Sequence, residues 1–244
     1  MYLTRFRVNT ARPGSRRLLS SPQVIHAAVM SSFPHLLPSS DDTPRVLWRI
    51  DHNARAEILL YIVSPDQPDL THLVEQAGWP AAAVNATADP RLRGWQTYPY
   101  APFLERITTG STWGFRLTAN PVHHIRRKEG EPKKRTAHIT PGYQMQWLLE
   151  RQEQSGFRIL TKPADRRLTD HGTEHDLIVH NRRDLRFKKS ADTTQTKHSV
   201  SVLAVTFDGR LEVTDPAALR RTLTAGLGKA KAYGCGLMTL APLG

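Results

Sequence analysis

His26 is the histidine, among the eleven in the chain, whose context best suits proton transfer. Ser20-Ser21-Pro22 predicts a helix that begins with a serine N-cap and a proline at its first position. Ile25 and Val29 would lie on the apolar face of this helix, with His26 beside that face at the edge of a cleft. An unperturbed imidazole has a pKa of about 6.5, so it can accept or donate a proton. The residues alone leave a structural and a catalytic interpretation of His26 open.

A glycine-rich segment near the C-terminus is a second candidate site. Residues 226–236 read Gly-Leu-Gly-Lys-Ala-Lys-Ala-Tyr-Gly-Cys-Gly. Glycine permits positive φ angles and lets backbone N–H groups approach a phosphate, to which the lysines would add charge. The segment follows a predicted helix and precedes a strand, whereas a Walker loop opens a helix. Either the segment binds phosphate, or its glycines are needed only for a tight connection. The residues concerned are Gly226, Gly228, Lys229, Lys231, Gly234 and Gly236.

The distribution of charge indicates a polyanionic partner. The formal net charge is +12, of which residues 1–110 contribute +2 and residues 111–244 contribute +10. So large an excess of positive charge in one half is typical of proteins that bind nucleic acid. A membrane surface is less favoured, because no predicted helix combines a cationic face with an aromatic one.

Two successive units of the same element order are expected to position these residues. In the first unit, strands and helices alternate as β-α-β-β-α-β, which is the order of a ferredoxin-like fold. Its elements are expected at residues 1–9, 20–33, 46–50, 57–63, 71–77 and within 95–108. The second unit is expected to repeat this order at residues 113–122, 141–154, 157–161, 199–207, 211–213, 215–224 and 237–240, with a hairpin turn at Asp208-Gly209 and a turn-rich basic excursion at 162–196.

The predicted fold class is therefore α+β, with two tandem ferredoxin-like (RRM-like) βαββαβ domains. We expect an N-terminal domain at residues 1–95, which carries the helix of His26, and a linker at residues 96–110. The C-terminal domain, at residues 111–244, would contain a basic hairpin insertion and the glycine-rich segment.

Neither a metal site nor a cofactor is expected. A single cysteine, Cys235, excludes an internal disulfide and a cysteine-cluster zinc site. His171 and His175 are separated by a stretch containing Gly172, which disfavours a helix with both imidazoles on one face. No apolar run approaches the roughly 20 residues of a membrane-spanning helix. The N-terminus lacks the pattern of a signal peptide, so a cytoplasmic protein without a membrane partner is expected.

Four segments resemble the CasE family of CRISPR-associated proteins, which belongs to the repeat-associated RNA-binding superfamily. They are the glycine-rich segment and residues 21–26, 114–121 and 207–213, read as SPQVIH, GFRLTANP and FDGRLEV. The glycine pattern is shared across the superfamily, whereas the four segments together resemble the CasE branch. The resemblance implies two ferredoxin-like domains and an endoribonuclease that cleaves CRISPR precursor RNA at the base of the repeat stem-loop. It also implies retention of the mature RNA in the type I-E surveillance complex.

The same resemblance implies that His26 is a general acid or base in metal-independent cleavage. The RNA 2′-OH attacks the phosphate, and the products carry a 2′,3′-cyclic phosphate (or 3′-phosphate) and a 5′-OH. Some relatives have a tyrosine three residues before this histidine and basic residues after it, where this chain has Gln23, Ala27 and Ser31. Arg16, Arg17 or a lysine of the C-terminal domain are the candidates for the missing cation.

Basic residues of the second half are the candidates for RNA binding, because A-form RNA is recognised largely through its shape and phosphates. They are Arg126, Arg127, Lys128, Lys133, Lys134, Arg158, Lys162, Arg166, Lys188 and Lys189. Each has an alternative interpretation as solvated surface charge. His123 and His124 flank the first of these stretches and are interpreted as loop residues or RNA contacts.

Two other functions stay open at this point. A non-catalytic RNA-binding subunit of a CRISPR ribonucleoprotein complex would explain the charge and the glycines without a role for His26. A metal-dependent nuclease would use histidines as ligands and would lose activity in a chelator.

Overall fold

The computed structural model describes residues 1–35, 44–54, 57–79, 94–125, 134–163, 165, 167, 174–189 and 198–243. It divides into two compact units. Unit 1 contains Met1–Arg106, Thr224–Gly226 and Lys231–Leu237, and unit 2 contains Ile107–Leu223, Leu227–Ala230 and Met238–Gly244. These units differ from the expected domains, because residues 96–106 and two C-terminal segments belong to unit 1. No helix within the described ranges is long and apolar enough to cross a membrane.

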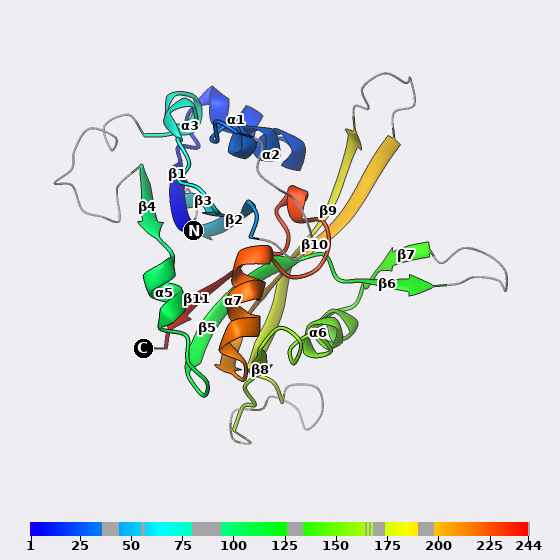
Figure 1. The fold of residues 1–244 in the computed structure, drawn as a ribbon. Helices are drawn as coiled ribbons and strands as arrows, with labels where there is room; N and C mark the ends of the chain where they lie inside the picture. The colour runs from blue at the N-terminus through cyan, green and yellow to red at the C-terminus, as the bar shows by residue number, and fades with distance from the viewer. Residues whose placement is uncertain are drawn as a thin grey trace. The chain divides into compact units, whose positions relative to one another are not determined.

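Unit 1 contains an antiparallel four-stranded sheet in the order β2-β3-β1-β4. Its strands are β1 (Tyr2–Val8), β2 (Leu47–Ala54), β3 (Glu57–Ser64) and β4 (Trp95–Pro99). The helices α1 (Pro13–Leu18), α2 (Pro22–Met30) and α3 (Thr71–Ala77) cover one face of this sheet, and α5 (Ala101–Glu105) follows β4 (Figure 1). Phe6 and Val8 of β1 pack against these helices, because alternate residues of a strand point to the same face.

Helix α2 forms where its sequence signals predict it. The hydroxyl of Ser21 accepts a hydrogen bond from the backbone N–H of Gln23 at 3.2 Å, and Pro22 occupies the first helical position. Ile25 and Val29, one turn apart, are buried in the core of unit 1. Burial of these two side chains fixes the rotation of the helix about its axis and therefore the direction in which His26 points.

Unit 2 contains a second antiparallel sheet in the order β11-β5-β10-β8, with β9 also paired to β10. Its strands are β5 (Thr112–Ala119), β8 (Phe157–Ile159), β9 (Leu177–Lys189), β10 (His198–Val213) and β11 (Met238–Pro242). Helices α6 (Pro141–Leu149) and α7 (Pro216–Ala225) belong to this unit, and β6 (Val122–Ile125) and β7 (Lys134–Ala137) form a separate hairpin (Figure 1). The expected fold of two ferredoxin-like units is confirmed.

The hairpin turn expected at Asp208-Gly209 is wrong. Strand β10 passes through both residues without a break, and Gly209 pairs with Phe115 on one side and Leu177 on the other. A Cβ atom on Gly209 would lie 2.3 Å from the carbonyl oxygen of Asp176 and 3.0 Å from the ring of Phe115. Glycine is therefore required here by the close approach of neighbouring strands rather than by a turn.

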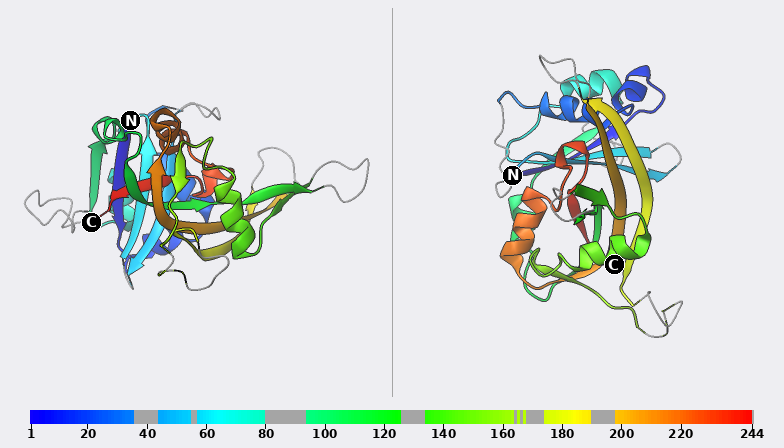
Figure 2. Two further views of the ribbon diagram at one scale, coloured as in Figure 1. Left: turned by 90° about the horizontal axis from the view of Figure 1, so that it is seen from below. Right: turned by 90° about the vertical axis from the view of Figure 1, so that its right-hand side faces the viewer.

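The turn-rich excursion expected between residues 162 and 196 is also wrong over residues 177–189. Residues 177–189 form β9, which runs beside β10 (Figure 2). The pairing register shifts between Ala204 and Thr206, and Asn181 opposite this shift has a φ of 51°. Such a bulge interrupts the two-residue alternation of buried and exposed side chains, so the sequence pattern conceals the strand.

Candidate active site and nucleic-acid interface

His26 lies partly buried on α2, beside the buried residues Ile25 and Val29. Its Nδ1 atom is buried and has no hydrogen-bond partner among the residues that the structure describes. Burial lowers the pKa of the imidazole, and the positive charge of Arg45 lowers this pKa further. The free protein therefore favours the neutral imidazole, which is the form that can accept a proton.

Arg45 is a residue of this site that the sequence did not reveal. It is partly buried just before β2, and its backbone N–H donates a hydrogen bond to the carbonyl oxygen of Thr224 at 3.2 Å. Arg16 and Arg17, the arginines proposed from the sequence, lie exposed on α1. No short sequence motif contains both Arg45 and His26. The two residues belong to different elements, and the folding of α2 and β2 into the same unit places them together.

The glycine-rich segment brings two further polar side chains to this helix. Residues Lys231–Tyr233 form the short 3₁₀ helix η2, which lies against α2 and β2. Lys231 and Tyr233 are partly buried there. Lys229, in the part of the segment that belongs to unit 2, is exposed. Of the two lysines, Lys231 is therefore the one whose segment packs against the helix of His26.

The four glycines of this segment all have backbone conformations that disfavour other residues. Gly226, Gly228, Gly234 and Gly236 have φ angles of 80°, 82°, 78° and 94°. A Cβ atom on Gly234 would lie 2.6 Å from the Trp48 ring. The steric interpretation of these glycines is thus sufficient to explain them, and their binding of phosphate stays a prediction.

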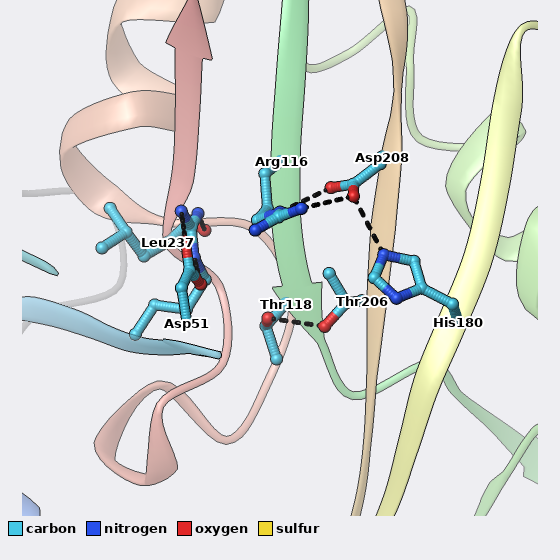
Figure 3. Close-up of polar contacts among 8 residues, drawn as sticks. Asp51, Arg116, Thr118, His180, Thr206, Asp208 and Leu237 are labelled. Atoms are coloured by element: carbon cyan, nitrogen blue, oxygen red, sulfur yellow. Dashed lines mark hydrogen bonds and ion pairs between the residues drawn. The ribbon is translucent and has the colours of Figure 1, made fainter. Parts of the chain in front are cut away.

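A buried ion pair holds the end of the glycine-rich segment on β2. The Arg49 guanidinium donates to the two Asp51 carboxylate oxygens at 2.7 and 2.9 Å and to the carbonyl oxygen of Leu237 at 3.1 Å (Figure 3). Arg49 is 1% exposed and Asp51 is 7% exposed. A charge this deeply buried requires such a partner. Through its hydrogen bond to Leu237, Arg49 also holds the chain against β2 directly after Gly236.

A polar cluster crosses three strands of unit 2. Arg116 of β5 donates two hydrogen bonds of 2.7 Å to Asp208 of β10, and His180 of β9 lies 3.0 Å from the same carboxylate (Figure 3). Burial alone would raise the pKa of Asp208, but its contacts with Arg116 and His180 together lower it. Asp208 is therefore a carboxylate at neutral pH and ties the three strands together.

The predicted RNA-binding residues are spread over several elements. Lys134 is exposed on β7, and Lys162 is partly buried, with its backbone N–H donating to the carbonyl oxygen of Glu174. Arg158 of β8 is exposed and pairs with Glu212 at 2.9 Å. The backbones of Lys188 and Lys189 lie in β9. The remaining members, Arg126, Arg127, Lys128, Lys133 and Arg166, lie outside the described residues.

Within the described ranges, no group of three or more histidine, cysteine, aspartate or glutamate side chains is placed to hold a metal ion. His175 is partly buried, while His171 and Gly172 lie outside the described residues.

Comparisons with known proteins identify the family. The sequence matches the CRISPR-associated protein family over residues 1–242. It is 30% identical over 243 residues to the CRISPR-associated endoribonuclease Cse3 of Thermus thermophilus, and the match covers 99% of this chain and 100% of that protein. The chain belongs to the CasE family.

Solved structures of similar proteins have the same fold. A structure of T. thermophilus Cse3, bound to an RNA that represents a pre-cleavage complex, matches with a TM-score of 0.70 and 26% identity. The match covers 99% of this CasE-family chain and 98% of that one. A chain of a CRISPR RNA-guided surveillance complex matches with a TM-score of 0.63 and 22% identity, over 100% of both chains, which is a likeness of fold.

This CasE-family chain has its own arrangement around the histidine. Gln23 lies partly buried on α2, and Ala27 and Ser31 are exposed at the positions where some relatives are basic. The cations that the structure places near α2 come from elsewhere in the chain, namely Arg45 before β2 and Lys231 of η2.

Proposed function

We propose that this protein is an endoribonuclease that cleaves CRISPR precursor RNA within the repeat, at the base of its stem-loop. One observation carries the proposal: a partly buried imidazole with a lowered pKa, His26, lies on a helix that packs against a lysine-bearing glycine-rich segment. The CasE-family relative with 30% identity is an endoribonuclease, which supports the substrate class.

His26 acts as the general base in the proposed reaction. The neutral imidazole removes the proton of the 2′-OH, and the 2′-oxygen then forms a bond to the adjacent phosphorus. The bond from phosphorus to the 5′-oxygen breaks, and the 5′-oxygen takes up a proton from water, while the proton held by His26 returns to solvent. The products are a 2′,3′-cyclic phosphate (or 3′-phosphate) and a 5′-OH. No step in this sequence uses a metal ion.

Arg45 and Lys231 stabilise the crowded phosphorane in this proposal. Negative charge increases on the phosphate oxygens as the 2′-oxygen attacks, and fixed cations in a partly buried site stabilise that charge more strongly than they would in water. Arg45 replaces in this role the basic residues that follow the histidine in some relatives. It also keeps His26 unprotonated before RNA binds, because its charge lowers the pKa of the imidazole.

Retention of the product is the second part of the proposal. The excess positive charge of residues 111–244 attracts RNA phosphates, and this attraction persists after cleavage. We infer that the protein holds the mature guide RNA within a type I-E surveillance complex in the cytoplasm, as CasE-family membership suggests.

The decisive experiment is incubation of a labelled CRISPR repeat hairpin with the protein in EDTA, followed by identification of the product ends. The wild type should produce one cut with a 5′-OH, and His26→Ala should reduce the single-turnover rate by about 10²–10⁴-fold. His35→Ala is the matched control, because His35 is an exposed histidine shortly after the same helix.

Three results would contradict the proposal. Unchanged cleavage by His26→Ala would remove the assigned base, and loss of wild-type cleavage in EDTA would indicate a metal-dependent nuclease. Tight binding of the hairpin without any cleavage by the wild type would favour the non-catalytic RNA-binding subunit.

A further inference from the structure

Three aromatic rings lie in a row beside the β6–β7 hairpin of unit 2. The rings of His123, on β6, and His138, just after β7, have centroids 4.3 Å apart and are tilted by 33°. The ring of Tyr143, on α6, stacks on His138 with a centroid distance of 6.0 Å and an interplanar angle of 26°. The row of rings therefore runs from the partly buried His123 to the exposed Tyr143.

Hydrogen bonds hold this stack in place. The side-chain amide of Gln144, which is 2% exposed, donates to the carbonyl oxygens of His138 and Ile139 at 2.9 and 3.1 Å. The backbone N–H of His138 donates to the carbonyl oxygen of Pro121 at 2.9 Å. The segment between β7 and α6 is thus tied to both neighbouring elements, so a ligand that stacks there would meet a preorganised surface.

The outer end of the stack is apolar and open to solvent. Tyr143 is 66% exposed, and Ile139, four residues before it, is 60% exposed. They are the two most exposed large apolar side chains of the described residues, and they lie within one five-residue segment, which makes them available to a ligand.

The charges around this end favour a nucleic acid. Arg182, which follows the bulge residue Asn181 in β9, donates to the carbonyl oxygen of Ile139 at 3.4 Å. Lys134 and Arg135 are exposed on β7, the strand that leads into His138. Flat aromatic rings beside exposed cations are the combination with which proteins bind single-stranded nucleic acid, since bases stack on the rings while phosphates meet the cations.

We propose that Tyr143, backed by His138, is a stacking site for one unpaired base of the bound RNA, either next to the stem or in its loop. The inference rests on the proposed function, because it requires that the protein binds the repeat RNA. It adds a contact with a base to a surface that otherwise recognises phosphates.

Binding of the full-length protein to the repeat RNA with its unpaired flanks tests the site. Tyr143→Ala should weaken binding by roughly 5- to 150-fold, the range for loss of one base–aromatic stack. Tyr143→Phe keeps the ring and should bind like the wild type. Tyr98→Ala removes a similarly exposed tyrosine, 53% exposed on β4, and should also leave binding unchanged.

Abasic RNAs then identify the base. Each unpaired nucleotide is replaced in turn by an abasic one, and the dissociation constant is measured with the wild type and with Tyr143→Ala. At one position the abasic change should weaken binding to the wild type and should not weaken binding to Tyr143→Ala any further. The stacking site is wrong if Tyr143→Ala binds the complete RNA like the wild type, or if its deficit persists with every abasic RNA.

Two further outcomes separate this inference from related ones. Normal RNA binding by Tyr143→Ala, together with lost association with the other complex subunits, would assign the surface to a protein partner and overturn the inference. A wild type that binds the RNA through Tyr143 but never cleaves it would refute the proposed function and leave the stacking site intact.

Discussion

The charge of Arg45 acts on the imidazole of His26, so that a cation from the start of β2 and burial on α2 together hold the histidine neutral. Burial is the larger of the two effects on the pKa, and Arg45 adds to it. The two residues are 19 positions apart and lie on different elements of unit 1. The cleavage rate at low pH should therefore depend on Arg45, although Arg45 transfers no proton.

Arg45→Gln should change both the rate of cleavage and its dependence on pH. With His26 as the base, the single-turnover rate of the wild type should rise with pH and level off above the pKa of His26, which lies below 6.5. Removing a nearby positive charge makes protonation of His26 easier, so this midpoint should move to higher pH. The plateau rate should fall by about 10²–10³-fold as the phosphorane loses a cation.

The pKa of His26 itself can be followed by an NMR titration of its ring protons in both proteins. A midpoint that stays the same or falls in Arg45→Gln would contradict the electrostatic coupling. A wild-type rate that decreases with pH through this range would instead assign His26 as the general acid.

Gly234→Ala should destabilise the protein more than Gly110→Ala does. The two glycines have φ angles of 78° and 80°, so each substitution places alanine in the left-handed region at a cost of roughly 1–2 kcal/mol. Only at Gly234 would the new Cβ collide with a ring, that of Trp48, whereas nothing lies within 4 Å at Gly110. We expect an additional loss of about 1–3 kcal/mol at Gly234, measured by urea unfolding. Equal losses would show that close packing at Trp48 is unimportant.

Asp51→Ala should be among the most destabilising single substitutions in unit 1. It leaves the buried Arg49 guanidinium without its carboxylate, which costs about 3–5 kcal/mol for a pair of this kind. Glu212→Ala removes the partner of the exposed Arg158 and should cost at most about 1 kcal/mol. Urea unfolding measures both. The double substitution Arg49→Met with Asp51→Leu should recover most of the stability. If it does not, the hydrogen bond from Arg49 to the carbonyl oxygen of Leu237 is itself required.

Lys229→Ala and Lys231→Ala should affect different steps. Lys229 is exposed, so its loss should weaken RNA binding and reduce the slope of log affinity against log salt by roughly 1. Lys231 lies in η2 against α2, so its loss should lower the cleavage rate at saturating RNA more than it lowers affinity. Arg106→Ala, which removes an exposed cation elsewhere, is the control for net charge. Equal effects of all three substitutions on affinity would contradict separate roles.

Local signals in the sequence predicted the helix of His26 and the four strands of unit 1, but not the short helices α1 and α5. These signals are the serine cap, Pro22 and the spacing of Ile25 and Val29. They involve residues only a few positions apart, so they can be read from the sequence. The long strands of unit 2 were predicted wrongly for the same reason: β9 was missed, and β10 was expected as two strands joined by a turn. Asp208-Gly209 has the composition of a turn, and its strand conformation depends on Arg116, 92 residues away, as the partner of Asp208.

The sequence by itself determined that the protein is basic mainly in its second half, that its fold is of the ferredoxin type and that His26 lies on a capped helix. Charge, helix caps and apolar periodicity are properties of the chain that do not require knowledge of distant contacts. Only the tertiary structure decided that Arg45 acts on His26, that η2 lies against α2 and that Tyr143 stacks on His138. These relationships depend on which buried faces pack together, because packing brings residues from distant parts of the chain within reach of one another.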